Sequence, residues 1–194
     1  WQKTRLWVVA KPMSGFAETF SHYLMEVSSG GGSDRPDDDR SAEHTLFVTS
    51  GEGNIRIADE KYYLSSGAYF YLPPKTDWSL RNDGDIPLTF HWFRKRYQQV
   101  DGIDLPPLLV TSDNAVKPIE MPHSNGAWST SRFVDPLDLR HDMHVNIVSF
   151  NPGGVIPFAE THVMEHGIYV LCGTAEYRFN TDIIEVEAGD YAWL

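Results

Sequence analysis

The sequence predicts an all-β protein that contains two copies of one β unit, and three observations support this fold class. Short runs rich in Val, Ile, Tyr, Phe and Trp recur along the 194 residues, separated by Gly, Pro, Asn and Asp. Helical periodicity is hard to find. A shift of 122 residues aligns two long segments of the chain without a gap, which is the signature of an internal repeat.

The strands are expected wherever such an apolar run is bounded by turn residues. The polar segment GGGSDRPDDDRS is expected to be an acidic loop, and residues 100–118 have the composition of a linker. In chain order, the candidate strands are residues 45–48, 54–57, 69–72, 88–93, 144–150, 168–171, 176–179 and 183–186.

The repeat relates residues 43–72 to residues 165–194. Its glycines fall at the same strand ends in both copies, where turns need a positive φ. We therefore expect an N-terminal unit over residues 1–108 and a C-terminal unit over residues 109–194. The matched residues are Glu43 and Glu165, His44 and His166, Val48 and Val170, Gly51 and Gly173, Arg56 and Arg178, Gly67 and Gly189, Tyr69 and Tyr191, and Leu72 and Leu194.

The two copies continue differently after their last matched residue. Leu72 is followed by PPKTDWSLRNDGDIPLTFHWFRKRY, which carries at least two more candidate strands, whereas the sequence given ends at Leu194. An open barrel would leave strand edges unpaired. We therefore expect the second barrel to be incomplete at its C-terminal end and the natural chain to be longer.

Composition and charge restrict the class of partner. The chain has 41% hydrophobic residues, and 16 Lys and Arg against 27 Asp and Glu give a formal net charge of −11. Such a charge repels phosphate backbones and anionic lipid surfaces, so we expect neither nucleic acid nor membrane partners. Cys172 cannot form an intrachain disulfide, which suits the cytoplasm. We expect it to be a small buried side chain.

One short stretch, FAETHVMEHGIYVLCG, carries a candidate metal site. It places Glu160, His162 and His166 within seven residues. One carboxylate and two imidazoles suit Mn, Fe, Zn or Ni, with positions left open for water and substrate. Glu160 and His162 share one face if they lie on a strand, and His166 joins them only if the chain turns at about residues 163–165.

Other interpretations of these residues stay open at this point. The string HVMEH matches a helical zinc-peptidase signature, although Pro157 and Gly167 leave little room for a helix. The histidines could also be ordinary polar residues at a barrel mouth. The remaining histidines have no metal-like spacing and are expected at the surface or at a barrel rim; they are His22, His91, His123, His141 and His144.

The same residues resemble a known family. NPGG, then E-x-H-x3-H, then EAGDYAWL resemble the two motifs of a cupin β-barrel, with Glu160 at the usual first His position and His166 at the usual Glu position. This inverted order, in the second half of a two-cupin chain, is similar to the ureidoglycine aminohydrolases, also called glyoxylate-induced proteins. The resemblance implies a bicupin, that is, two jelly-roll barrels.

The resemblance also implies the chemistry. Glu160, His162 and His166 would bind Mn2+, with Fe2+, Zn2+ or Ni2+ as other options, and Tyr177 would line the substrate cavity. A fourth ligand, a glutamine, would lie about six residues beyond Leu194. The implied enzyme is a homo-oligomer that releases ammonia from the small molecule (S)-ureidoglycine, with Glu160 as a possible proton acceptor and Tyr177 as a hydrogen-bond donor.

The first copy lacks the same ligand set. The shift of 122 residues places Asp38 at the position of Glu160 and Arg40 at that of His162, so that His44 alone is kept. Arginine stays protonated and cannot coordinate a cation. We therefore expect the first barrel to be metal-free. Two other functions remain open for the second barrel: a non-haem Fe(II) oxygenase, and a ligand-binding module without enzymatic activity.

Overall fold

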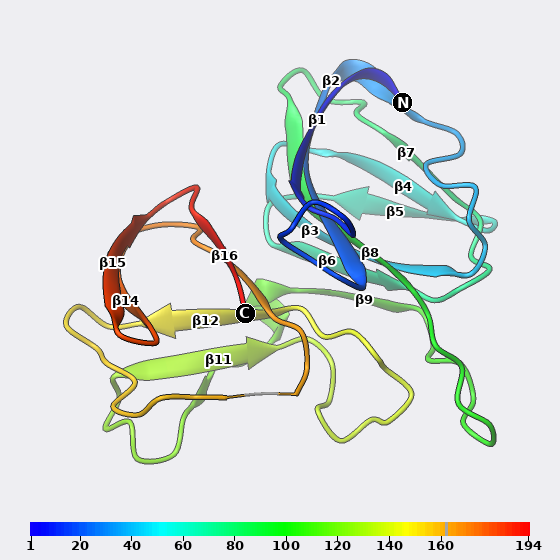
Figure 1. Cartoon of the computed structure of the whole chain (residues 1–194). Helices are drawn as coiled ribbons and strands as arrows, with labels where there is room; N and C mark the ends of the chain where they lie inside the picture. The colour runs from blue at the N-terminus through cyan, green and yellow to red at the C-terminus, as the bar shows by residue number, and fades with distance from the viewer. Residues whose placement is uncertain (162) are drawn as a thin grey trace.

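The structure is a computed structural model that describes residues 1–161 and 163–194, and it confirms the all-β prediction (Figure 1). A 3-10 turn covers Asp113–Ala115. The strands in the described residues are β1 (Gln2–Ala10), β2 (Phe20–Ser33), β3 (Ala42–Ser50), β4 (Gly53–Ile57), β5 (Glu60–Leu64), β6 (Ala68–Leu72), β7 (Trp78–Arg81), β8 (Leu88–Arg96), β9 (Leu109–Ser112), β10 (Ile119–Glu120), β11 (Trp128–Arg132), β12 (Asn146–Phe150), β13 (Gly167–Tyr169), β14 (Thr174–Phe179), β15 (Asp182–Glu187) and β16 (Tyr191–Trp193).

The first unit is one curled antiparallel sheet. Its strands follow the order β5-β4-β7-β2-β8-β3-β6-β9, and β1 pairs with β2 at one side. Alternate residues of these strands point inward, as the two-residue period of a strand requires. Leu46 on β3, Phe70 on β6 and Phe90 on β8 are almost completely buried members of the inner core.

Strands β3 and β6 are buried on both of their faces. Every residue of β6 is buried, and Phe47 and Tyr69 point away from the inner core. Phe133, which follows β11, stacks on Tyr69 with ring centroids 4.0 Å apart. The outer face of the first sheet thus forms a second core with the following unit, and β6, with the sequence AYFYL, is a continuous apolar run for this reason.

The second unit is built from small sheets that reproduce part of the first. In the described residues these are β10-β11-β12, β13-β16 and β14-β15. The pairing of β14 with β15 repeats that of β4 with β5, and β13 with β16 repeats β3 with β6. Figure 1 shows these C-terminal strands as a separate group beside the first sheet.

Individual backbone hydrogen bonds are repeated at equivalent positions of the two copies. The Gly67 amide donates to the carbonyl of Val48 at 2.9 Å, and the Gly189 amide donates to the carbonyl of Val170 at 2.9 Å. Gly67 has φ +83° and Gly189 φ +100°, so both turns use the conformation that glycine adopts without strain. The expected equivalence of the two segments is confirmed at this level.

The predicted linker contains a strand. β9 lies within residues 100–118 and pairs with β6, with Phe70 opposite Val110. Two prolines and several acidic residues around a four-residue strand hid it in the sequence. The division of the chain at residues 108 and 109 stays a prediction.

Cys172 is exposed and not buried, because it lies in the turn between β13 and β14, next to Gly173. No helix in the described part of the chain has the length and apolar character needed to cross a membrane.

Candidate metal and substrate site

Glu160 is exposed and lies in an irregular stretch between β12 and β13. Glu160 therefore does not meet the condition, a position on a strand, under which it would share one face with His162. Gly153 and Gly154, followed by Pro157, interrupt extended pairing here. The described residues between β12 and β13 contain no helix, so the helical zinc-peptidase interpretation is also wrong.

His166 directly precedes β13 and is half-buried. Its backbone amide donates to the carbonyl of Leu194 at 3.0 Å, and the Leu194 amide donates back at 2.9 Å. The same pairing joins His44 and Leu72 in the first copy. A strand of the second unit therefore fixes the backbone of the predicted ligand His166.

Tyr177 lies on β14, half-buried, with its ring stacked on Phe179 at a centroid distance of 4.5 Å. Burial raises the pKa of the Tyr177 hydroxyl, and the negative charge of Glu160 raises it further. The structure thus brings Glu160 and Tyr177, 17 residues apart in the chain, into the same electrostatic environment. A neutral phenol beside a carboxylate can donate a hydrogen bond to a polar substrate.

His162 lies outside the described residues, so the structure does not test the predicted ligand set. Among residues 1–161 and 163–194, no group of three or more His, Cys, Asp and Glu side chains could hold a metal ion. Two of the three predicted ligands, Glu160 and His166, remain in that range, and their donor types, oxygen and nitrogen, fit a divalent transition metal.

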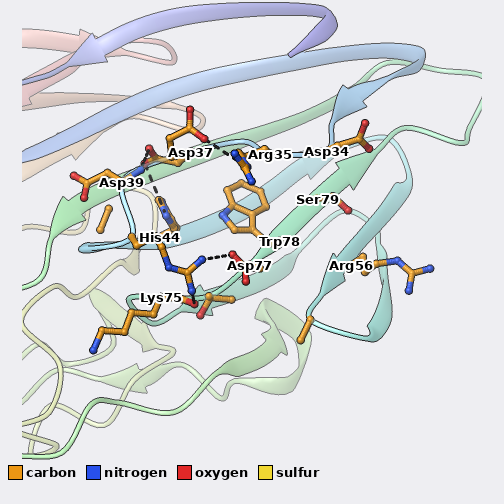
Figure 2. A pocket seen from close by; sticks show the side chains of 15 residues that line it. Asp34, Arg35, Asp37, Asp39, His44, Arg56, Lys75, Asp77, Trp78 and Ser79 are labelled. Atoms are coloured by element: carbon orange, nitrogen blue, oxygen red, sulfur yellow. Dashed lines mark hydrogen bonds and ion pairs between the residues drawn. The ribbon is translucent and has the colours of Figure 1, made fainter.

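The first unit has a cavity of about 390 Å³ at its own barrel mouth, where His44 lies (Figure 2). His44 is buried, and its Nδ1 accepts a hydrogen bond from Trp92 Nε1 at 3.3 Å. Burial lowers the pKa of His44 to about 4, against the attraction of Asp37. His44 is therefore neutral near pH 7.

Arginine side chains form ion pairs with three carboxylates that line this mouth, those of Asp37, Asp39 and Asp77. Arg94 forms ion pairs with Asp37 and with Asp39, the latter at 2.9 Å. Arg40, at the position equivalent to His162, pairs with Asp77. Figure 2 shows Arg35, Asp37 and Asp77 around Trp78, among the residues that line the cavity. The expectation that the first unit binds no metal stays a prediction.

Comparisons with known proteins give the family. The cupin domain profile matches residues 23–94. The chain is 32% identical over 178 residues to the (S)-ureidoglycine aminohydrolase of Escherichia coli (strain K12), covering 91% of this chain and 66% of the relative. It is 54% identical to a Pseudomonas aeruginosa crystal structure described as a glyoxylate-induced protein, with a TM-score of 0.94, covering 100% of this chain and 73% of that one. The chain belongs to the cupin family of (S)-ureidoglycine aminohydrolases.

Another curated aminohydrolase and another solved structure are also similar to the chain. The chain is 29% identical over 183 residues to the Arabidopsis thaliana enzyme, covering 91% of this chain and 58% of the relative. Protein Ylba from E. coli superposes with a TM-score of 0.85 at 28% identity, covering 99% of this chain and 74% of that one. The chain spans about two thirds or less of the curated aminohydrolases that it matches.

Sequence reasoning missed two groups of buried polar side chains in this family member. His22 and His91 were expected at the surface or a rim, but both are buried and their Nε2 and Nδ1 atoms lie 2.8 Å apart. Tyr169 and Tyr191 of the second unit pack edge-on against His22. Burial by another unit leaves no local pattern in the sequence, so spacing could not reveal it.

Glu43 belongs to the second missed group. It is fully buried and accepts a hydrogen bond of 2.7 Å from the Tyr71 hydroxyl. Burial, and then a hydrogen bond with Asp142 of the second unit, raise the pKa of Glu43 to about 9. No donor among residues 1–161 and 163–194 faces Glu43 Oε1, as expected if this oxygen carries the proton and donates it to Asp142. The signal in the sequence was the match of Glu43 with Glu165.

Proposed function

We propose that this protein releases ammonia from (S)-ureidoglycine by hydrolysis and gives (S)-ureidoglycolate, within purine and allantoin breakdown. The observation that carries the proposal is the 32% identity to the E. coli aminohydrolase over 91% of this chain. The match includes both units and is therefore more specific than a likeness in fold alone.

The substrate suits the residues of the candidate site. Ureidoglycine carries an amine, a ureido group and a carboxylate on one carbon, and water must replace the amine. Glu160 accepts a proton from that water or from a substrate nitrogen, which requires the charged carboxylate. Tyr177 stays protonated because its pKa is raised, and it donates a hydrogen bond to the ureido or carboxylate oxygen.

A divalent cation completes the proposal. Glu160, His162 and His166 would hold it, with Mn2+ as the first choice and Fe2+, Zn2+ or Ni2+ as alternatives. When bound, such a cation attracts the substrate carboxylate and stabilises negative charge that develops during the reaction. Tyr177, which is half-buried on β14, orients the substrate beside the cation.

The expected setting is a cytoplasmic homo-oligomer that acts on a small molecule. The single cysteine suits a reducing compartment. The negative net charge of −11 gives no advantage with nucleic acids or anionic membranes.

The test compares Glu160→Gln with Glu185→Gln in the full-length protein. Both variants lose one carboxylate, but Glu185 is exposed on β15. We expect ammonia release from freshly generated (S)-ureidoglycine to fall at least about 100-fold in Glu160→Gln, since an amide accepts no proton near neutral pH. Glu185→Gln should keep wild-type turnover, and the thermal unfolding of both variants should match that of the wild type.

Removal of the metal is the second part of this test. Chelation should abolish ammonia release, and added Mn2+ should restore it. Undiminished turnover by Glu160→Gln would contradict the role given to this residue. Oxygen consumption without ammonia release would instead support an Fe(II) oxygenase, and binding without turnover would support a ligand-binding module.

A further inference from the structure

We propose that Glu165 is a positioning residue for the candidate site, because its carboxylate attaches the turn that leads into His166 to the first unit. This inference rests on the proposed function of the second unit. It gives the first unit a defined part in the site: its N-terminal segment holds a predicted ligand in place.

Four hydrogen bonds fix the carboxylate of Glu165. Oε2 accepts from the Thr19 amide at 2.9 Å and from the Thr19 hydroxyl at 2.5 Å. Oε1 accepts from Trp193 Nε1 at 2.9 Å and from the Glu18 amide. A carboxylate offers about four acceptor sites, so this one is fully used. Glu18 and Thr19 lie just before β2 of the first unit, some 146 residues away in the chain.

The chain on the other side of His166 is packed equally closely. A Cβ atom added to Gly167 would lie 2.3 Å from the Tyr191 hydroxyl oxygen and 3.0 Å from Cζ of Phe20. The Tyr191 hydroxyl donates to the carbonyl of Phe16 at 3.3 Å. His166 therefore lies between two residues that both contact the segment 16–20 of the first unit.

The first copy contains an equivalent arrangement, in which a glutamate of the first unit contacts a segment of the second unit. Glu43 has the position of Glu165, and Tyr71 has the position of Trp193. Tyr71 binds Glu43, and Asp142 of the second unit faces it. In each copy the glutamate before the histidine is thus held by an aromatic side chain of its own unit and by a segment of the other unit.

The contacts of Glu43 and Glu165 differ in the role of the histidine that follows each glutamate. His44, next to Glu43, is enclosed among Trp78 and Trp92 and accepts a hydrogen bond from Trp92. His166, next to Glu165, is a predicted metal ligand. Because a ligand must be held to within about 0.5 Å of its working position, loss of the contact at Glu165 should weaken metal binding.

The substitution Glu165→Gln tests this directly. Either orientation of the amide directs its NH2 group at two donors, the Thr19 pair or the Trp193 and Glu18 pair, so that one half of the contact is lost. We expect the Kd for Mn2+ to rise about 10- to 100-fold, as when the supporting shell of a metal site is removed. The Kd is measured by electron paramagnetic resonance of free Mn2+ during titration of the full-length protein.

The repeat supplies the matched control, Glu43→Gln. This glutamate carries a proton in the fold, and a glutamine can accept from Tyr71 and donate to Asp142 in the same way. We expect its Kd for Mn2+ to equal that of the wild type. Thermal unfolding without metal is measured for each variant. If Glu165→Gln does not fold, Thr19→Val takes its place. It removes only the hydroxyl donor to Glu165 and should raise the Kd for Mn2+ by a smaller factor.

The outcomes separate this inference from the proposed function. An unchanged Kd in Glu165→Gln, or an equal rise in Glu43→Gln, would overturn the positioning role even if the wild type releases ammonia. A raised Kd in Glu165→Gln alone would support the positioning role. If the wild type binds Mn2+ but releases no ammonia, that result rejects the proposed reaction and leaves the positioning role to be decided by the Kd values.

Discussion

Replacing Glu43 by glutamine should make the stability of this protein much less sensitive to alkali. Glu43 is fully buried, next to Asp142 and in contact with the Tyr71 hydroxyl. Lys95 Nζ, 2.5 Å from Asp142 Oδ2, is the nearby cation. Burial and the hydrogen bond with Asp142 raise the pKa of Glu43 from its ordinary 4.5 to about 9.

The sign and size of the effect follow from proton linkage. Between pH 4.5 and about pH 9, the folded protein keeps a proton that the unfolded chain releases. The contribution of Glu43 to the free energy of unfolding therefore falls by about 1.4 kcal/mol for each pH unit through this window. The pKa of Asp142 is lowered, so this carboxylate is charged throughout and adds no slope. Glutamine has no proton to release, so this contribution to the pH dependence should vanish in the variant.

The assay is thermal unfolding of wild type and Glu43→Gln at a series of pH values. From about pH 6 to about pH 8 the wild type should lose about 3 kcal/mol relative to the variant. For a chain of this size that corresponds to about 6–12 °C in Tm. Glu185→Gln, an exposed control, should follow the wild type. Parallel Tm curves for wild type and Glu43→Gln would refute the buried, protonated state of Glu43.

Two other predictions use the contacts between the units. Phe133→Ala removes the ring stacked on Tyr69 at 4.0 Å and should lower the free energy of unfolding by about 3–5 kcal/mol, measured by urea denaturation. Burial lowers the pKa of His22 to about 3 and that of His91 to about 4, so the unfolded chain takes up protons first as the pH falls below 6.5. Stability should therefore decrease from pH 6.5 toward about pH 4, and His22→Gln should reduce this acid slope; an unchanged slope would contradict the neutral buried pair.

The repeat made most of the fold predictable from the sequence. Glycines and apolar runs fix where strands end, and matching them across 122 residues gave the register of both copies. The match could have been extended, since His22 falls on His144, Gly31 on Gly153 and Gly32 on Gly154 by the same shift. It would have identified β2 and β12 as equivalent strands, which isolated strand propensities did not.

The contacts between the units could not be predicted in this way. Glu43 and Glu165 are obvious as a matched pair, yet the partners that bind them, Asp142 and Thr19, come from segments far away in the sequence. The alternation of residues along a strand indicates which of its faces is buried, but it does not indicate which other surface covers that face. The ligand roles of Glu160 and His166 stay predictions, and they rest on residue type because coordination chemistry depends on it.

The pairing of β9 with β6 has a practical consequence for protein dissection. Ala68 lies opposite Ser112 and Tyr71 opposite Leu109 in this pair. Expressing residues 1–108 alone would remove β9 and leave the backbone groups along one edge of β6 without their partners. Such an edge pairs readily with other chains, so the isolated fragment should aggregate. A fragment that ends after Ser112 would keep this edge covered, which makes it the better choice for studying the first unit by itself.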